Sequence, residues 1–428
     1  MTSQPGFQAE VHQNPYLPAA GTVVDAVVSV AASAVARHAA AGPPDAAQVI
    51  MVDCSGSMDD PPSKMAEAKK ATIAAIESLR DGVAFAVVAG RDYAELVYPP
   101  APPLVPASRQ SRVEAQHAVS RLGAGGGTAV GSWLRLTNNL FTGHPAEVKH
   151  AIMLTDGRNE HETPRELATA LRGCERHFVC DTRGVGSDWS GTELRLVASA
   201  LLGTADGLAH PEELVADFRL MTETAMGKAL GEVTLRLWTP AGSTIRFVKQ
   251  VFPHVDDLTG RRSPVSPRIG DYPTGAWGTE SRDYHISVDL PAGATGEERL
   301  AARVSLVDHD QVLVESRVTA TWTADQTLYT RINPRVAHYT GQAELATAIQ
   351  DGLAARAAGD AATATAKLGR AVHLAHLTGH HETVELLSRL VDVIDPRHGT
   401  VRLRDDATGV DAELANVRSV RTVRIGHG

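Results

Sequence analysis

Three short, oxygen-bearing side chains follow one apolar run in the first part of the chain. The run spans residues 49–52, and the side chains are those of Asp53, Ser55 and Ser57 in Asp-Cys-Ser-Gly-Ser. Carboxylate and hydroxyl oxygens at alternate positions are the ligands that a small, hard divalent cation takes. The same residues by themselves also suit an Asx or Ser capping turn without an ion. The motif therefore needs downstream partners before it indicates a metal site.

Two such partners are present. Thr128 follows the glycines at 125–127, and Asp156 follows a second apolar run at 149–155. Because glycine lacks a Cβ, a glycine-rich loop can carry the threonine close to an ion. In an open parallel sheet, ligands bind at the edge where the strands have their carboxyl ends. We therefore expect Thr128 and Asp156 to complete the site that the Asp-x-Ser-x-Ser loop begins.

The elements that must position these donors follow from the hydrophobic pattern between residues 48 and 224. Short apolar runs alternate there with segments whose apolar residues have helical spacing. Strands are expected at 49–52, 83–89, 95–98, 149–155, 177–181 and 205–208. Helices are expected at 63–79, 112–122, 130–141, 164–171, 192–202 and 211–221. This alternation predicts an α/β fold with a doubly wound, mainly parallel sheet covered by helices on both faces.

The donor set resembles the metal-ion-dependent adhesion site (MIDAS) of von Willebrand factor type A (VWA) domains, in particular those of intracellular bacterial proteins. All five ligand positions match, at Asp53, Ser55, Ser57, Thr128 and Asp156. The resemblance covers about residues 48–225. It extends to Arg183-Gly184-Val185-Gly186 and to the acidic-Leu pair Glu193-Leu194.

The resemblance implies a role for each donor. The two serines bind the cation directly, and Thr128 and Asp156 complete the shell directly or through water. Mg²⁺ is the expected ion, because it keeps several waters in octahedral oxygen geometry; Mn²⁺ and Ca²⁺ are the alternatives. Neutral hydroxyls with only two carboxylates leave the cation incompletely neutralised. A carboxylate from another protein can then replace an exchangeable water.

The expected function is a protein-protein interaction module that depends on a divalent cation and is not an enzyme. Its partner offers an acidic side chain, and the resemblance implies an AAA+ ATPase as such a partner. The alternatives are a metal-assisted phosphoester hydrolase that uses the same cation and a scaffold with no ion. Ser55 stands where haloacid-dehalogenase phosphatases have a second aspartate. The phosphate-loop sequence Gly-Lys-Ser/Thr and the nucleophile-elbow sequence Gly-x-Ser-x-Gly are both unmatched.

The pattern changes on either side of this α/β region. Beyond about residue 231, alternating or apolar segments separated by Gly, Pro and Asp turns indicate an antiparallel β-sandwich. Strands near the N-terminus lack partners in the α/β region, so we expect them to join the sandwich. An Ala/Leu-rich helical part follows. The expected domains are N-terminal strands 1–40, a VWA domain 45–226, a β-sandwich 230–326, a helical bundle 336–398 and a tail 399–428.

Composition and charge exclude several classes of protein. The 428 residues are 43% hydrophobic and 21% charged, which is typical of a globular protein. A net charge of −9 disfavours binding to nucleic acid and to anionic lipid. No stretch approaches the roughly 20 apolar residues of a membrane helix, and no signal peptide is evident. With only three cysteines and no disulfide framework, we expect a cytoplasmic protein with no nucleic-acid or membrane partner.

Two further polar groups stand out. His373, His376 and His380 lie on one face at helical spacing, which suits a zinc site. No cysteine or carboxylate at standard spacing accompanies them, so structural or surface histidines are the favoured interpretation. The run Glu160-His161-Glu162 after Asp156 is expected as a solvated loop near the metal face that shapes the choice of partner.

Overall fold

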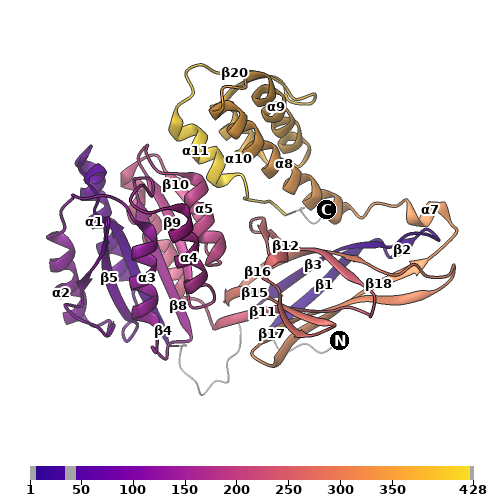
Figure 1. Cartoon of the computed structure of the whole chain (residues 1–428), viewed down its shortest axis with the longest axis horizontal. Helices are drawn as coiled ribbons and strands as arrows, with labels where there is room; N and C mark the ends of the chain where they lie inside the picture. The colour runs from indigo at the N-terminus through magenta and orange to yellow at the C-terminus, as the bar shows by residue number, and fades with distance from the viewer. Residues whose placement is uncertain (1–5, 34–44, 425–428) are drawn as a thin grey trace. The chain divides into compact units, whose positions relative to one another are not determined.

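The computed structural model describes residues 6–33 and 45–424 and divides into two compact units. The α/β unit consists of Ala40–Gly231 and Thr408–Arg418. The β-sandwich unit consists of Met1–Ala39, Glu232–Ala407 and Ser419–Gly428. Figure 1 labels the elements of both units.

A seven-stranded, mainly parallel sheet forms the centre of the α/β unit, which confirms the predicted fold class. Its order is β10-β9-β8-β4-β5-β6, and β7 also pairs with β5. All neighbours from β10 to β5 are parallel, whereas β6 and β7 run antiparallel to β5. The strands are β4 (Ala46–Asp53), β5 (Ala84–Gly90), β6 (Ala94–Tyr98), β7 (Val105–Pro106), β8 (Val148–Thr155), β9 (Val179–Val185) and β10 (Ala205–Leu208).

Helices cover both faces of this sheet. One face carries α1 (Ser63–Ser78), α2 (Arg109–Ser120) and α6 (Leu214–Met226), with the short 3-10 helix η2 (Pro211–Glu213) before α6. The other face carries α3 (Val130–Phe141), α4 (Pro164–Cys174) and α5 (Gly191–Ala200). The starts of α2 and α4 are fixed by capping boxes, in which an N-cap hydroxyl and the side chain three residues later satisfy each other's backbone N–H groups.

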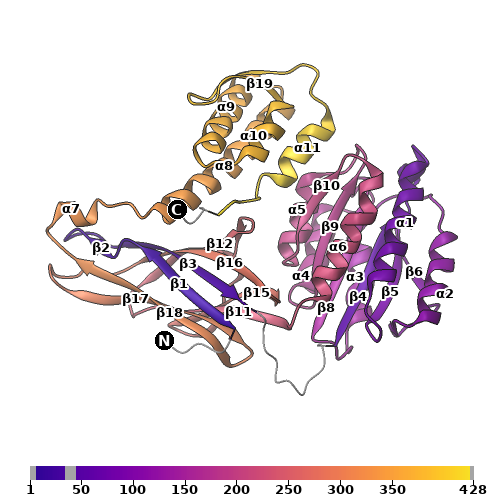
Figure 2. The ribbon, with the colours of Figure 1, turned by 180° about the vertical axis from the view of Figure 1, so that it is seen from behind.

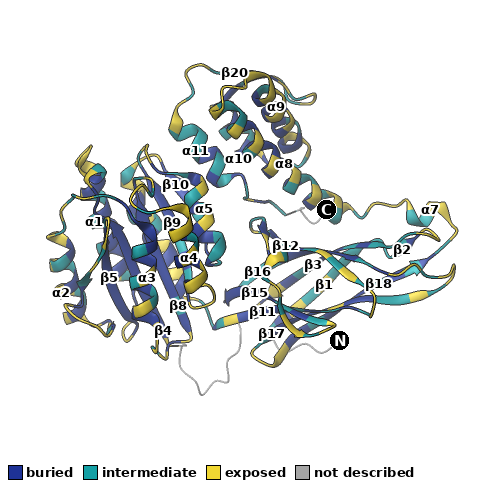
Figure 3. Ribbon diagram, in the orientation of Figure 1, coloured by how far each residue is buried: buried dark blue, intermediate teal, exposed yellow. Residues whose placement is uncertain are grey.

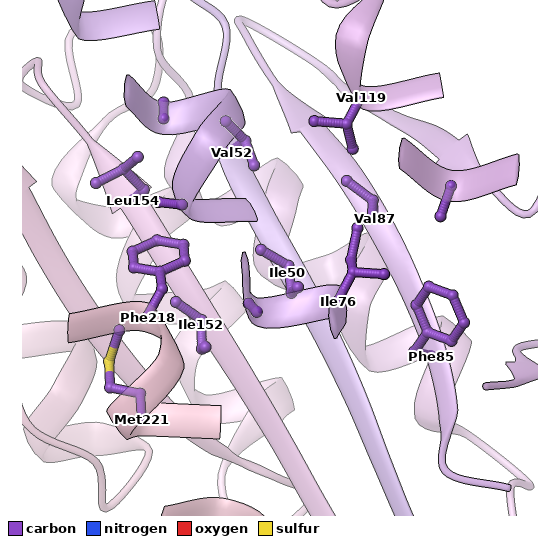
Figure 4. Close-up of a cluster of buried hydrophobic side chains, with 14 of the residues drawn as sticks. Ile50, Val52, Ile76, Phe85, Val87, Val119, Ile152, Leu154, Phe218 and Met221 are labelled. Carbon is purple, nitrogen blue, oxygen red and sulfur yellow. The ribbon is translucent and has the colours of Figure 1, made fainter. Parts of the chain in front are cut away.

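Buried apolar side chains pack between the sheet and the helices and stabilise this layered arrangement. All eight residues of β4 are buried, as the dark blue strand in Figure 3 shows. Figure 4 shows Ile50 and Ile152 of neighbouring strands packed with Ile76 of α1 and Phe218 of α6. Each such side chain contributes about 1.5–3 kcal/mol when it leaves water. The central strand is therefore a rigid support for whatever follows its carboxyl end.

The strand order reverses at β4. After β4 the chain passes through α1 to β5 on one side, and later returns to β8 on the other side. In open α/β sheets, ligands bind beyond the carboxyl ends of the strands at such a reversal. Asp53 ends β4 and Asp156 directly follows β8, so the topology brings both carboxylates to this position.

Two larger sheets form the sandwich of the β-sandwich unit. One has the order β1-β3-β16-β12-β13 and the other β14-β15-β11-β17-β18-β2. Near the N-terminus, β3 pairs antiparallel with both β1 and β16, and Figure 2 shows β1 beside β3. The first sheet contains β1 (Phe7–Gln13), β3 (Val23–Ala32), β12 (Thr244–Phe252), β13 (Asp256–Asp257) and β16 (Glu280–Asp289). The second contains β2 (Tyr16–Leu17), β11 (Leu230–Trp238), β14 (Ser263–Ser266), β15 (Ile269–Trp277), β17 (Glu298–Asp308) and β18 (Gln311–Trp322).

Helices complete the β-sandwich unit. They are η3 (Thr259–Arg261), α7 (Gln326–Tyr329), α8 (Pro334–Ala357), α9 (Ala361–Leu377) and α10 (His381–Ser388). Tyr339 of α8 contacts Val27 and Val251 in the sandwich, and its hydroxyl donates to the buried Asp283 carboxylate. This hydrogen bond holds α8 against the sheet that contains β3.

The C-terminal part differs from the sequence-based expectation. A helical bundle was expected over residues 336–398, but its last helix, α10, ends at Ser388, and β19 (Val391–Asp395) pairs with β20 (Thr400–Leu403). The expected tail 399–428 contains both β20 and a further helix, α11 (Gly409–Arg418), which belongs to the α/β unit. Local apolar spacing does not show whether residues 409–418 are a tail or a packed helix, because the elements that α11 packs against lie about 200 residues earlier in the chain.

No helix in the described parts of the chain is both long enough and apolar enough to cross a membrane. Cys54, Cys174 and Cys180 are free and buried. Burial raises the pKa of the Cys54 thiol to about 12 and that of Cys174 to about 11, so both stay protonated at neutral pH.

Candidate metal centre

Asp53 anchors the candidate site beneath the sheet edge. Its side chain is fully buried, and its two oxygens accept hydrogen bonds from the Ser55 amide at 2.8 Å and the Thr155 hydroxyl at 2.6 Å. Burial raises the pKa of Asp53 to about 6, although the Ser55 and Thr155 hydrogen bonds oppose this shift. Thr155 is the last residue of β8, so the Asp53 carboxylate bridges the ends of two neighbouring strands.

The two serines lie at the start of the 3-10 helix η1 (Gly56–Asp59), which follows β4. Their hydroxyl oxygens are 3.0 Å apart. The Ser57 hydroxyl also donates to Oδ1 of Asp156 at 2.7 Å. The tight 3-10 turn thus places both hydroxyls on the same side as the Asp156 carboxylate.

The glycine-rich loop lies against the serine loop through backbone contacts. The Gly125 amide donates to the Cys54 carbonyl at 2.8 Å, and the Gly56 amide donates to the Gly126 carbonyl at 3.0 Å. Gly126 has a φ of +83°, and a Cβ there would lie 2.7 Å from an Asp92 carboxylate oxygen. A residue with a side chain would therefore be strained at this point of closest approach. Thr128 follows directly, at the same edge as the serines.

The loop after Asp156 holds Thr128 in place. The Thr128 amide donates to Nδ1 of His161 at 3.1 Å, and the His161 amide donates back to the Thr128 carbonyl at 3.0 Å. Two side chains then satisfy the first amides of α3: Asn159 accepts from Val130 at 2.9 Å, and Glu162 accepts from Gly131. The run at 160–162, expected to be a solvated loop that shapes the choice of partner, thus includes two residues that position the threonine loop.

Gly157 forms the floor between the serine and threonine loops. A Cβ on Gly157 would lie 3.3 Å from the Thr128 hydroxyl and 3.5 Å from the Ser57 hydroxyl. Ser55, Ser57 and Thr128 line an open pocket above this floor, whereas Asp53 and Asp156 are buried below it. The rim of the pocket carries four charged or titratable side chains, Arg158, Glu160, His161 and Asp188.

Hydrogen bonds therefore link Asp53, Ser55, Ser57 and Asp156, and Thr128 lies beside them across Gly157. The donor set fits a small divalent cation, because neighbouring ligands of an octahedral Mg²⁺ at 2.0–2.1 Å lie about 2.9 Å apart. The serine hydroxyls have that spacing. No three His, Cys, Asp or Glu side chains gather as metal ligands among the residues that the structure describes.

The Gly-x-Gly and acidic-Leu motifs noted in the sequence supply residues that support the loop after Asp156 and the neighbouring side chains. The Glu193 carboxylate accepts a hydrogen bond from the Asn159 amide at 3.1 Å, and burial raises the pKa of Glu193. Gly184 leaves room for the Trp189 ring, because a Cβ there would lie 2.3 Å from it. Gly186 has a φ of +79° and a similarly close neighbour, the side chain of Lys64.

Lys64 is the site residue that sequence reasoning missed. It lies in the first turn of α1, which reads as an ordinary amphipathic helix, yet it is only 3% exposed. Its ammonium group is 2.8 Å from Oδ2 of Asp156 and 3.4 Å from the Ser57 carbonyl. A positive charge is therefore built into the candidate metal centre.

Among the described residues, His373, His376 and His380 do not gather into a group that could hold a metal ion. His380 lies outside α9, and its two ring nitrogens already pair with the Arg421 carbonyl at 3.0 Å and the Thr383 hydroxyl at 2.8 Å. Nδ1 of His373 pairs with the Arg397 carbonyl. Because these ring nitrogens are used in hydrogen bonds, His373 and His380 have structural roles.

The positioning role of the loop after Asp156 leads to a prediction. Replacing Glu162 with alanine removes the acceptor of the Gly131 amide, so the threonine loop loses a support. We expect the affinity for Mn²⁺ to fall about ten-fold, as is typical when a group that orients a ligand is lost. Isothermal titration calorimetry measures this change. Glu160→Ala is the matched control, because it removes a pocket-rim charge from the same loop; an equal loss in both variants would contradict a positioning role.

Comparisons with known proteins agree with this geometry. Residues 47–206 match the von Willebrand factor type A domain, and residues 373–419 match the von Willebrand factor type A C-terminal domain. A solved von Willebrand factor type A protein from Catenulispora acidiphila is 49% identical, with a TM-score of 0.94 over 99% of this chain and 98% of that one. The chain therefore belongs to the von Willebrand factor type A family. VWA domains commonly bind metal at a MIDAS and mediate protein interactions.

More distant relatives extend the fold comparison. The ArnB paralog VWA2 from Sulfolobus acidocaldarius has a TM-score of 0.61 at 13% identity, over 97% of this chain and 98% of that one, which shows a shared fold. An uncharacterized Synechocystis protein, sll0103, is 28% identical over 234 residues. This match covers 53% of each chain, so the chain spans about half the length of that curated relative.

Proposed function

We propose that the α/β unit binds Mg²⁺ through Asp53, Ser55, Ser57, Thr128 and Asp156 and docks a carboxylate of a partner protein there. One observation carries this proposal. Ser55, Ser57 and Thr128 line an open pocket, while the fully buried Asp53 and Asp156 are not part of its lining. A cation held in this way has protein oxygens on one side and the mouth of the pocket on the other.

Each residue has a defined task in this proposal. Asp53 and Asp156 supply the negative charge that attracts a divalent cation, and their burial makes that charge effective. Ser55, Ser57 and Thr128 supply neutral oxygens without cancelling further positive charge. When bound, the ion offers positive charge and replaceable water positions to an anionic oxygen. The chemistry favours a carboxylate ligand over a neutral group.

The surroundings support docking over catalysis. The pocket is open. Nδ1 of His161 already accepts a hydrogen bond from the Thr128 amide, so this nitrogen is occupied and does not act as a general base. The nearby Cys54 thiol is buried with a raised pKa, so it is a poor nucleophile. We therefore place the protein among interaction modules and keep metal-assisted phosphoester hydrolysis as the outcome that a direct assay would reveal.

A capture experiment tests the proposal. The full chain is immobilised and exposed to native cell extract in Mg²⁺, in Mn²⁺, or with a chelator. We expect one partner to be retained only with the cation and to be released by free glutamate or acetate. An AAA+ ATPase is the partner class that the family resemblance implies. Turnover of a phosphoester substrate by the wild-type protein, lost on chelation, would replace docking with hydrolysis.

A further inference from the structure

Lys64 places an ammonium group inside the candidate metal centre. Its side chain is 4% exposed, and Nζ is 2.8 Å from Oδ2 of Asp156, whose side chain is fully buried. The other oxygen of this carboxylate, Oδ1, accepts the Ser57 hydroxyl. A single buried carboxylate is thus shared between a fixed positive charge and one of the hydroxyls proposed to bind the cation.

The chain is shaped to hold the ammonium group in this position. Gly186 has a φ of +79°, and a Cβ at this residue would lie 2.7 Å from Cε of Lys64. The lysine stem therefore passes over a residue that must lack a side chain. The Ser57 carbonyl at 3.4 Å is a further contact of the ammonium group. The Asp188 carboxylate lies 3.8 Å away, but its side chain is 64% exposed, so solvent screens its charge.

A charge count shows the consequence. A cation held by two carboxylates and neutral hydroxyls keeps part of its positive charge, and Lys64 adds one more positive charge to the same site, in contact with one of these carboxylates. Like charges repel most strongly where the effective dielectric constant is low. An extra positive charge therefore weakens the hold on the cation and strengthens the attraction for an anionic ligand.

We infer that Lys64 lowers the affinity of the site for the divalent cation and raises the affinity of the cation-loaded site for a carboxylate. This inference rests on the proposed function, because it needs a cation at the five oxygen donors. It makes cation and partner binding mutually dependent: a carboxylate that joins the site offsets the charge of Lys64. By reciprocity, an acidic partner then tightens cation binding by the same factor as the cation tightens partner binding.

The test uses the full chain and two probes, Mn²⁺ alone and acetate. In Lys64→Gln, the side-chain amide still offers an N–H donor to Asp156 but carries no charge. We expect Mn²⁺ to bind at least about ten-fold more tightly to this variant by calorimetry. Acetate binding to the Mn²⁺-loaded protein, followed by water-proton relaxation, is expected to weaken by about three-fold or more. A merely structural role for Lys64 would not move the two affinities in opposite directions.

Two further variants make the result decisive. Lys64→Met removes the charge and the donor but keeps a long apolar stem, so it must show the same two trends. Lys70→Gln is the control, because Lys70 is on the same helix with a side chain that is 63% exposed. Unchanged or weaker Mn²⁺ binding in both Lys64 variants, with wild-type binding intact, would overturn the inference alone. No Mn²⁺ binding by the wild type or by any variant would overturn the proposed function together with it.

Discussion

The double variant Ser55→Ala/Ser57→Ala is expected to lose divalent-cation binding almost completely. Both serines line the pocket, and the hydroxyl of each is a proposed direct ligand. Removing two ligands is expected to weaken Mn²⁺ binding by about 100-fold or more, which corresponds to about 2.7 kcal/mol. Capture of a cation-dependent partner should disappear with it. Calorimetric titration with Mn²⁺ and Mg²⁺ measures the first effect, and the capture experiment measures the second.

The fold should survive this change. Asp53 keeps its hydrogen bonds from the Ser55 amide and the Thr155 hydroxyl, and Asp156 keeps its ion pair with Lys64. The lost side-chain hydrogen bonds are each worth about 0.5–1.5 kcal/mol. Ser187→Ala is the matched control, because Ser187 lines the same pocket outside the donor set. Full cation affinity in the double variant would rule out the serines as ligands.

The proximity of Asp53 and Asp156 could be predicted from the sequence because it follows from the parallel pairing of the two strands that precede them. A buried strand must end where its apolar run ends, and the carboxyl ends of β4 and β8 adjoin because these strands pair in parallel. Asp53 and Asp156 therefore had to lie close together once the parallel sheet was recognised. The positions of their side chains, by contrast, depend on Thr155 and on backbone contacts that no residue spacing reveals.

Lys64 could not be found in this way. In sequence it is one of several lysines on an amphipathic helix, where the solvated face is the usual place for lysine. Its burial depends on Gly186, which lies at the end of a different strand, and on the charge of Asp156. Pairing with a carboxylate offsets part of the cost of burying an ammonium group, and residue spacing does not reveal this pairing.

The sequence of the loop after Asp156 only partly indicated its role in positioning the threonine loop. Its polar residues suit a solvated segment, and the same residue types also cap helices. The structure uses Asn159 and Glu162 for the amides of α3, and His161 for the amide of Thr128. Asn and Glu just after a strand end are consistent with both roles. Only the position of α3 beside this loop decides between them.

The helix α11 (Gly409–Arg418) illustrates the limit most clearly. It buries only Leu414, Ala415 and Val417, so its amphipathic pattern is weak over ten residues. Its partners in the α/β unit are α5 and β10. Arg418 donates to Asp206 at 2.7 Å, and the Glu413 carboxylate accepts from the Gly191 amide at the start of α5 at 2.8 Å. A segment that looks like a tail thus supplies the acceptor for another helix's first turn.

Replacing Leu414 with alanine is therefore expected to destabilise the α/β unit. Leu414 is 3% exposed and lies beside Gly207, which also leaves room for the Trp189 ring. The cavity left by the substitution should lower the free energy of unfolding by about 2–4 kcal/mol. Because α11 has few buried residues, the loss should first appear as local opening of this helix.

Two measurements on the full chain check this prediction. Thermal or denaturant unfolding should show a less stable transition, and hydrogen exchange should quicken at the amides of α11 and at Gly191, whose acceptor is Glu413. Leu220→Ala is the matched control, because Leu220 of α6 is 62% exposed and the same atoms are removed. Equal stability and equal exchange in the two variants would mean that α11 contributes nothing to the unit. A large difference would establish residues 409–418 as a structural part of the domain that contains the candidate metal centre.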